Sequence, residues 1–400
     1  MKRLEVDYAE IYLDNNATTP TLPQVREAMM EALEVGYGNA SSAHGAGDRS
    51  RKILRDAREN VAGIIGAIPE HAYLTSGGTE ANNMVLLSVL SNAGCRRVVT
   101  TKVEHSSVLR ACEYLAENGV DVVFLEPDSA GRFELDQVIS ALDQAPTALV
   151  SVQWVNNETG VIQQIETIGR ICRERSVVFH TDAAQAVGKI PIEIEDLPID
   201  LFSMTAHKIH GPQGIGALYI RNRDHVHPII HGGPQESNLR PGTENLAGIV
   251  GFGAAAEHRT QTMKASLPKM TNLRNSFESS ILDMIGDVRI NGDLGSRVCN
   301  STNLRFEGVD GQALVAQLDA RGIRCSQSSA CTNRRPEPSY VLRAMGLSEE
   351  EAFESVRFSF SELNTEIEVE TAVNVIAENV LKLRDFAARL DDLSPRKVAS

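Results

Sequence analysis

Residues 177–216 read VVFHTDAAQAVGKIPIEIEDLPIDLFSMTAHKIHGPQGIG, and this stretch decides the fold. It contains two short apolar runs, 177–180 and 201–204, separated by a segment with many turn-forming and acidic residues. Apolar runs of this length, bounded by turns, are typical of buried strands in a parallel sheet. The first run leads to Asp182 and the second to Lys208, so we expect each strand to end beside a chemically useful side chain.

The same rhythm continues toward the N-terminus. Short apolar runs occur at 97–100, 120–125 and 148–152, and helical patterns or turn-rich stretches lie between them. Residues 49–65 place their apolar side chains at helical spacing. This alternation predicts an α/β fold with a mostly parallel sheet, helices on both faces, and ligand sites beyond the carboxyl ends of the strands.

The pattern changes near residue 260. A polar helical stretch at 258–269 precedes the run 287–292, and short strand and helix patterns continue to the C-terminus. We interpret this part as a second, smaller α+β domain. Its acidic segment, 362–378, is predicted to be a helix with a solvated face.

The composition excludes several classes of protein. The chain has 400 residues, 42% of them hydrophobic, and a formal net charge of −14. This acidic balance argues against direct binding of nucleic acid or of anionic membranes. No segment approaches the ~18 apolar residues of a membrane helix, and no signal peptide is recognisable. The six cysteines contain no Cys-x-x-Cys pair, so reduced thiols and a cytoplasmic location are expected.

Lys208 and Asp182 together indicate a cofactor. A lysine sequestered at a strand end is partly desolvated, which favours the neutral amine and Schiff-base chemistry, although a surface lysine in a loop fits the same pattern. A buried aspartate needs a cationic or hydrogen-bond-donating partner, and a protonated pyridine nitrogen is one. Pyridoxal phosphate enzymes need such a lysine, such an acid and a phosphate-binding site.

Residues 75–80, TSGGTE, are the candidate phosphate site because they precede a helical pattern, and a helix N-terminus binds phosphate. A simple turn with a threonine cap explains them as well. His105 follows an apolar run and is a candidate for stacking on a ring or for acid–base chemistry; a structural histidine is the alternative. Asn157 follows another run, where a turn residue is equally compatible.

Cys331 is the candidate sulfur nucleophile. Small polar residues, two prolines, Arg334 and Arg335 surround it, which predicts an exposed loop with positive potential and a lowered thiol pKa. Arg357 is a candidate clamp for a substrate carboxylate, with a structural salt bridge as the alternative. A metal could be suggested by His225, His227 and His231, but no nearby cysteine or carboxylate completes a ligand set, so no metal site is expected.

Taken in order, these motifs resemble those of the cysteine desulfurases of the NifS/IscS type, which are fold type I pyridoxal phosphate enzymes of the class V aminotransferase family. The resemblance spans nearly the whole chain. Its further motifs are 12–20 (YLDNNATTP), 38–42 (GNASS), 155–160 (VNNETG), 207–212 (HKIHGP) and 240–243 (RPGT).

The resemblance implies a large cofactor domain at 15–262 with a mostly parallel seven-stranded sheet flanked by helices. It also implies a smaller α+β domain made of 1–14 and 263–400, which carries the cysteine loop. The residues implied to bind pyridoxal 5'-phosphate are Gly78, Thr79, His105, Asn157, Asp182, Gln185, Thr205, His207, Lys208 and, from the second subunit of a homodimer, Thr243. Those implied to bind substrate are Asn39, Asn157 and Arg357, and those implied to be catalytic are Lys208, Cys331 and His105.

The implied reaction converts L-cysteine to L-alanine and leaves the sulfur on Cys331 as a persulfide. An acceptor protein then takes the sulfur for iron–sulfur cluster assembly, tRNA thiolation or DNA phosphorothioation. One departure concerns Ser328, which stands where the family commonly has glycine; a side chain there restricts the backbone of the loop.

Two other functions stay open. Another fold type I lyase or aminotransferase, such as a selenocysteine lyase, would use Lys208 and Asp182 without needing Cys331. A non-catalytic binding protein that retains the fold is the more remote alternative.

Overall fold

The computed structural model describes residues 10–92, 94–327 and 337–393, and it divides into two compact units. Unit 1 comprises the described residues of Met1–Ala17, Glu158–Gly160 and Ser266–Ser400, and unit 2 comprises those of Thr18–Asn157 and Val161–Ala265. The described part of the chain contains no helix that is both long and apolar enough to cross a bilayer.

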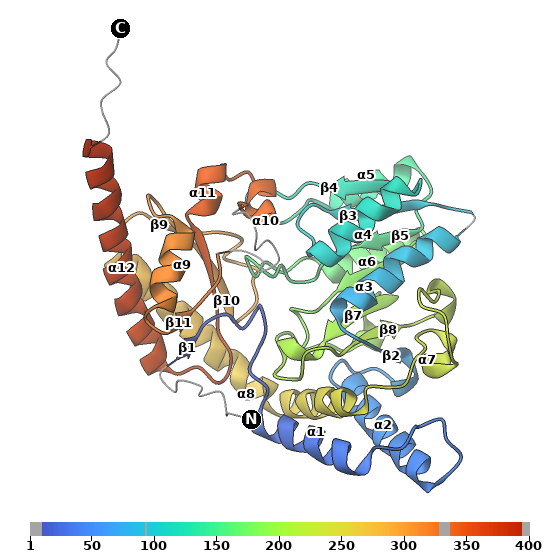
Figure 1. The fold of residues 1–400 in the computed structure, drawn as a ribbon. Coiled ribbons are helices and arrows are strands. Elements are labelled where there is room, and N and C mark those ends of the chain that lie inside the picture. Colours follow the sequence, from blue (N-terminus) through green and yellow to red (C-terminus); the bar gives the residue numbers. More distant parts are fainter. Residues whose placement is uncertain (1–9, 93, 328–336, 394–400) are drawn as a thin grey trace. The chain divides into compact units, whose positions relative to one another are not determined.

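Unit 2 is built on one seven-stranded sheet (Figure 1). Only β8 runs antiparallel to its neighbours, so the predicted mostly parallel sheet is confirmed. The five apolar runs of the sequence all form strands. In sheet order the strands are β2 (Ala72–Thr75), β8 (Gly216–Ile220), β7 (Leu201–Thr205), β6 (Val178–Asp182), β5 (Leu149–Ser151), β3 (Arg97–Thr101) and β4 (Asp121–Leu125).

Helices pack on this sheet because their apolar stripes match its buried faces. For example, α3 packs against β7 and β8, and α6 packs against β6. The helices of unit 2 are α1 (Pro23–Val35), α2 (Gly45–Gly63), α3 (Gly78–Leu87), α4 (Ser106–Glu117), α5 (Leu135–Gln144), α6 (Ile165–Glu174), the short α7 (Gln235–Asn238) and the first part of α8 (Leu246–Met284). Short 3₁₀ turns are η1 (Pro69–His71), η2 (Ser88–Ser91), η3 (Ile194–Asp196), η4 (Ala206–Lys208) and η5 (Arg223–His225).

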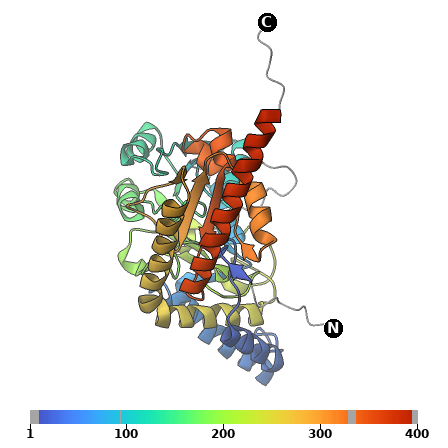
Figure 2. The same cartoon turned by 90° about the vertical axis from the view of Figure 1, so that its left-hand side faces the viewer.

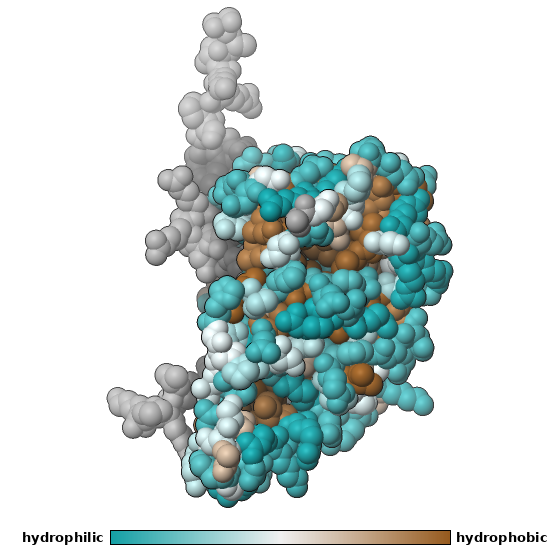
Figure 3. All heavy atoms as spheres, turned by 90° about the vertical axis from the view of Figure 1, so that its right-hand side faces the viewer, coloured by the Kyte–Doolittle hydropathy of each residue, from teal (hydrophilic) through white to brown (hydrophobic). Residues whose placement is uncertain are grey.

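The surface of unit 2 agrees with the composition. Figure 3 shows a face that is predominantly hydrophilic and interrupted by hydrophobic patches. Among the exposed large apolar side chains of this unit are Tyr37, Tyr114 and Ile230. Scattered exposed apolar residues are normal on a soluble protein and need no partner to explain them.

Unit 1 is an α+β unit around two small sheets. In one, β9 (Val288–Ile290) and β12 (Ser355–Ser359) flank β10 (Ser301–Phe306) and run antiparallel to it. In the other, β1 (Ile11–Tyr12) pairs in parallel with β11 (Ile323–Arg324). The helices are the part of α8 from Ser266 onward, α9 (Gly311–Asp319), α10 (Tyr340–Ala344), α11 (Glu349–Phe353) and α12 (Glu366–Leu393).

The core of unit 1 is aromatic at its centre. Phe277 of α8 contacts Phe358 and Phe360, with ring centroids 4.9 and 5.4 Å apart. Figure 2 shows α8 and α12 running along this unit, and both helices contribute buried apolar side chains to the same core. The acidic segment 362–378 is therefore solvated on one face only, because Val373 and Ile376 on the other face are buried.

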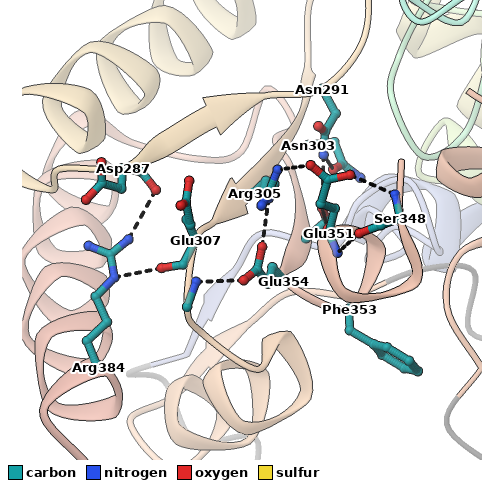
Figure 4. A network of polar contacts seen from close by, with 12 residues as sticks. Asp287, Asn291, Asn303, Arg305, Glu307, Ser348, Glu351, Phe353, Glu354 and Arg384 are labelled. Carbon is teal, nitrogen blue, oxygen red and sulfur yellow. Dashed lines mark hydrogen bonds and ion pairs between the residues drawn. The ribbon is translucent and has the colours of Figure 1, made fainter. Parts of the chain in front are cut away.

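A polar network joins β10 to the short helix α11 (Figure 4). Arg305 of β10 forms ion pairs with Glu351 and with Glu354, the latter with 2.7 Å between Nε and Oε2. A capping box of Ser348 and Glu351 closes the N-terminus of α11. Because α10 and α11 follow residues 328–336 in the chain, this network anchors the C-terminal side of the segment that contains Cys331.

The sequence predicts a domain boundary at residue 262, and the helix α8 runs across that position without a break. The two compact units separate between residues 265 and 266, inside the same helix. The change from apolar to polar composition near residue 260 therefore occurs within one continuous helix.

We expect Gly216→Ala to destabilise unit 2. A Cβ atom at residue 216 would lie 2.7 Å from both Cα of Gly77 and the carbonyl oxygen of Met204, so the backbone of the loop before α3 would have to move. Such overpacking costs about 1–3 kcal/mol in the free energy of unfolding, measurable by urea denaturation. Gly63→Ala is the control, since its Cβ would meet nothing within 4 Å and alanine favours a helix. Equal stability of the two variants would contradict this close approach.

Candidate active site

Asp182 is the buried charge at the centre of the site. It is the last residue of β6 and is only 3% exposed. Its Oδ2 accepts a hydrogen bond from Nδ2 of Asn82 (2.8 Å), and its Oδ1 accepts one from the backbone N–H of Ala184 (3.0 Å). Within the described residues these hydrogen-bond donors are neutral amides. A cationic partner would therefore complete the environment of this carboxylate.

Lys208 lies one short turn beyond β7, the strand next to β6. The turn η4 is fixed by Thr19, whose backbone N–H and hydroxyl both donate to the carbonyl oxygen of His207, each at 2.9 Å. The charge of Lys208 helps to lower the pKa values of His105 and His207 after the larger effect of burial. Lys208 therefore lies within electrostatic reach of both histidines.

His105 stands at the N-cap of α4, in the short turn that follows β3. Its Nδ1 accepts a hydrogen bond from the backbone N–H of Ser107 (3.2 Å) and lies 2.8 Å from the hydroxyl of Ser107. Burial lowers the pKa of His105, and Lys208 adds to this effect, whereas Asp182 opposes it. The imidazole is therefore neutral at neutral pH and lies near both Asp182 and Lys208.

His207 is also neutral. Burial, followed by the charges of Lys208 and Lys189, lowers its pKa to about 3. Its Nδ1 lies 3.2 Å from the hydroxyl of Thr18. A phosphate beside His207 would therefore meet a hydrogen-bonding imidazole rather than a positive charge.

The TSGGTE segment forms the N-terminus of α3. Gly77, with φ of +153°, is the N-cap residue, and Gly78 and Thr79 are the first residues of the helix. The space beside Gly78 is open, since an added Cβ would find its nearest neighbour, Cβ of Thr205, at 4.0 Å. Exposed amides at such a helix start, next to the end of β7, form a suitable site for a phosphate group.

Gln185 and Asn157 are both buried in unit 2. Oε1 of Gln185 accepts a hydrogen bond from Nζ of Lys189 (2.6 Å). The amide nitrogen of Gln185 therefore faces away from Lys189, where it can act as a donor. Oδ1 of Asn157 accepts a hydrogen bond from Nε2 of Gln153 (3.3 Å). The sequence analysis missed Lys189, although its place four residues after Gln185 is a usable signal.

Two of the predicted residues lie on exposed loops of unit 2. Asn39 uses its side-chain oxygen to accept the backbone N–H of Ser41 (2.8 Å), which is an Asx turn. Thr243 is exposed in the segment between α7 and α8. The roles assigned to them by resemblance stay predictions.

Arg357 lies in unit 1, on β12, and is 2% exposed. Its Nη2 is 2.7 Å from Oδ1 of Asp14, so the salt bridge that the sequence left as an alternative is present. Its role toward substrate stays a prediction. Cys331, Ser328, Arg334 and Arg335 lie outside the described residues.

The segments on either side of residues 328–336 are anchored within unit 1. Ser326 exchanges two backbone hydrogen bonds with Arg357, and Nε2 of Gln327 donates to the carbonyl oxygen of Phe353 (2.7 Å). On the far side, the hydroxyl of Ser339 donates to the carboxylate of Glu158, and Ser339 also caps α10. The chain therefore enters and leaves the segment of Cys331 at defined positions.

Glu104 is an acid that the sequence analysis missed. It is fully buried next to His105, and its Oε1 accepts hydrogen bonds from the hydroxyl of Thr101 (2.8 Å) and the backbone N–H of Gln153 (2.9 Å). Burial, with a smaller contribution from Asp182, raises its pKa to about 8. Its place after the β3 run was visible in the sequence, but its hydrogen bond to the backbone of Gln153, 49 residues away, was not.

The donor set of unit 2 fits pyridoxal phosphate. A buried carboxylate, a lysine amine and a neutral imidazole lie at one edge of the sheet, beside a helix N-terminus with open space at Gly78. A planar ring with a basic nitrogen, an aldehyde and a phosphate matches these groups in number and in chemistry.

The chain is similar to known proteins over most of its length. A model of the class-V aminotransferase family matches residues 11–371. The cysteine desulfurase of Nostoc sp. is 43% identical to this chain over 383 residues, which cover 96% of each protein. A solved NifS-like protein superposes with a TM-score of 0.87 at 35% identity, covering 93% of this chain and all of the other. The protein SspA, solved in complex with cysteine, superposes with a TM-score of 0.79 at 34% identity, covering 89% of this chain and all of SspA.

We expect Glu104→Gln to flatten the dependence of stability on pH. The pKa of Glu104 is about 8 in the folded state, and its usual value is 4.5. Between these two pH values the native state therefore holds a proton that the unfolded state has already lost. Its contribution to stability is therefore full below about pH 4.5 and is lost as the pH rises through about 8. The slope reaches at most about 1.4 kcal/mol per pH unit.

Urea denaturation at several values between about pH 5 and pH 8 measures this slope. The wild-type protein should lose more stability than Glu104→Gln over this interval, because glutamine still accepts both hydrogen bonds but has no proton to lose. Parallel curves for the two proteins would show that Glu104 does not titrate in this range.

Proposed function

The chain belongs to the class-V aminotransferase family and, within it, to the cysteine desulfurases, and from that premise we propose how its residues divide the reaction. The protein is an enzyme that removes sulfur from cysteine. We propose that pyridoxal 5'-phosphate binds at the carboxyl ends of β6 and β7. The observation that supports this most is the placement of Asp182 and Lys208 on adjacent strands beside the N-terminus of α3.

The cofactor, when bound, supplies an electron-accepting ring that stabilises negative charge at the α-carbon of an amino acid. Asp182 would hold the ring nitrogen through its carboxylate, and His105 would hold the face of the ring. Lys208 would hold the cofactor through its amine and, when released, would take the α-proton of the substrate. Gln185, oriented by Lys189, would donate to the ring hydroxyl.

The phosphate would be held by neutral donors. The amides of Gly78 and Thr79 open α3, and Thr205 and the neutral imidazole of His207 lie at the end of β7. Thr243 of a second subunit completes this site in a homodimer, which its exposure on a loop permits. Asn39, Asn157 and Arg357 position the substrate.

Cys331 takes the sulfur. Its thiolate attacks the sulfur of L-cysteine, a sulfur–sulfur bond forms, and the carbon–sulfur bond breaks with its electron pair left on the carbon skeleton. Protonation of that carbon and return of a proton to the α-carbon yield L-alanine, and the persulfide on Cys331 passes its outer sulfur to a thiol of an acceptor protein. The solved relative SspA binds cysteine, which supports the same substrate for this chain.

The proposed acceptors are proteins of iron–sulfur cluster assembly, tRNA thiolation or DNA phosphorothioation. A cytoplasmic location is proposed with them, since each of these acceptors works on intracellular material. Another lyase of the same fold is the second candidate, and the role of Cys331 separates the two.

Cys331→Ser should keep cofactor binding but lose alanine formation from L-cysteine, because a hydroxyl is a far poorer nucleophile toward sulfur than a thiolate. We expect a loss of at least about 100-fold in kcat. Alanine release and the cofactor absorption band are measured on the same samples.

Two control variants accompany this test. Cys95→Ser changes a partly exposed cysteine of unit 2, and Cys325→Ser changes a buried one six residues from Cys331. Both should retain activity. Full desulfuration by Cys331→Ser, with the sulfur found on Cys325 by mass spectrometry, would assign the nucleophile to Cys325 instead.

A further inference from the structure

Two residues outside the predicted site, Asn82 of α3 and Ser107 of α4, connect the two groups that flank the proposed cofactor ring. Nδ2 of Asn82 donates to Oδ2 of Asp182 (2.8 Å) and to the hydroxyl oxygen of Ser107 (2.9 Å). The hydroxyl of Ser107 in turn lies 2.8 Å from Nδ1 of His105. Which atom donates and which accepts in each of these hydrogen bonds follows from the groups that can only donate.

The direction is fixed first at His105. The backbone N–H of Ser107 lies 3.2 Å from Nδ1, and an N–H group can only donate, so Nδ1 carries no proton. Since the ring is neutral at neutral pH, its single proton resides on Nε2. The hydroxyl of Ser107 must then also donate to Nδ1, which leaves its oxygen to accept from Asn82.

The direction is fixed again at Asn82. An amide nitrogen has two protons, and here one goes to Asp182 and the other to Ser107. The reversed amide would place Oδ1 of Asn82 against a carboxylate oxygen, so that two acceptors would face each other. We call the hydrogen-bonded series Asp182–Asn82–Ser107–His105 the relay. Asn82 is its donor in both directions: it donates directly to Asp182, and it donates to Ser107, whose hydroxyl donates to His105.

Burial makes this relay effective. The exposed fractions are 1% for Asn82, 7% for Ser107 and 3% for Asp182, so solvent has little access to replace a missing donor. A buried polar group that loses its partner is costly, and chains of hydrogen bonds strengthen one another in a medium of low polarity. Among the described residues, the charged and titratable groups near His105 are Asp182, Lys208, His207 and Glu104, the chain neighbour of His105.

We propose that Asn82 and Ser107 are positioning residues that hold His105 with its proton on Nε2 and tie that ring to Asp182. His105 then meets the cofactor and substrate as a hydrogen-bond donor through Nε2. The inference rests on the proposed function for its catalytic meaning, but the tautomer itself is a property of this chain alone.

The test uses NMR of the ring nitrogens in protein with isotopically labelled histidine, with and without pyridoxal 5'-phosphate. In the wild-type protein we expect the unprotonated signal from Nδ1 of His105 and the protonated signal from Nε2, near neutral pH and in both forms. Ser107→Ala keeps the backbone N–H that faces Nδ1 at 3.2 Å but loses the hydroxyl at 2.8 Å, and Asn82→Ala loses the donor that orients this hydroxyl. With only the longer backbone hydrogen bond to Nδ1 assured, both variants should shift this pattern toward a mixture of tautomers. They should also lower kcat at least about 10-fold, with a smaller change in KM.

Asn83→Ala is the matched control. Asn83 is the next residue of α3 and donates to backbone carbonyl oxygens of Thr79 (2.9 Å) and Ser107 (3.4 Å), so it joins the same helices without entering the relay. It should keep the wild-type tautomer and kcat. Ser107→Ala removes only one oxygen atom and therefore supplies the result if Asn82→Ala does not fold.

The outcomes separate the relay from the proposed function. A proton on Nδ1 in the wild-type protein, or an unchanged tautomer and kcat in Ser107→Ala, would overturn the relay while cofactor binding and alanine release stand. A proton on Nε2 in a protein that binds no pyridoxal phosphate would support the relay and overturn the proposed function.

Discussion

The carboxylate of Asp182 is buried at the end of β6 and accepts hydrogen bonds from neutral amides. A buried carboxylate is costly unless hydrogen-bond donors or cations surround it. Unit 2 supplies the amides of Asn82 and Ala184 for this purpose. The parallel sheet brings the ends of β3, β5, β6 and β7 to one edge. Lys208 and His105 then lie within electrostatic reach of one another because their strands end there.

The same constraint explains why the surrounding histidines are neutral. Burial lowers the pKa values of His105, His180 and His207, and those of His180 and His207 fall to about 4 and about 3. Burial also raises the pKa of Glu104 to about 8, so this carboxyl group holds its proton at neutral pH. Asp182 and Lys208, an acid and an amine on adjacent strands, are the groups that an electron-accepting ring requires.

Local sequence predicted the parts of the site that depend on strand ends. Asp182 and Lys208 follow apolar runs, and the TSGGTE segment precedes a helix, so each could be found without knowing its neighbours. Asn82 and Ser107 could not, because their partners are distant in the chain: Asn82 is 25 residues from Ser107 and 100 from Asp182. Such contacts depend on how α3, α4 and β6 pack. The boundary near residue 260 was read from composition, which does not reveal that one helix crosses it.

A crystal structure of the protein grown with pyridoxal 5'-phosphate tests most directly whether the edge formed by Asp182 and Lys208 is the cofactor site. We expect continuous electron density from Nζ of Lys208 to the cofactor, the ring nitrogen within hydrogen-bonding distance of Asp182, and the phosphate at the backbone amides of Gly78 and Thr79. A cofactor bound elsewhere, or one whose ring nitrogen faces a residue other than Asp182, would contradict this assignment.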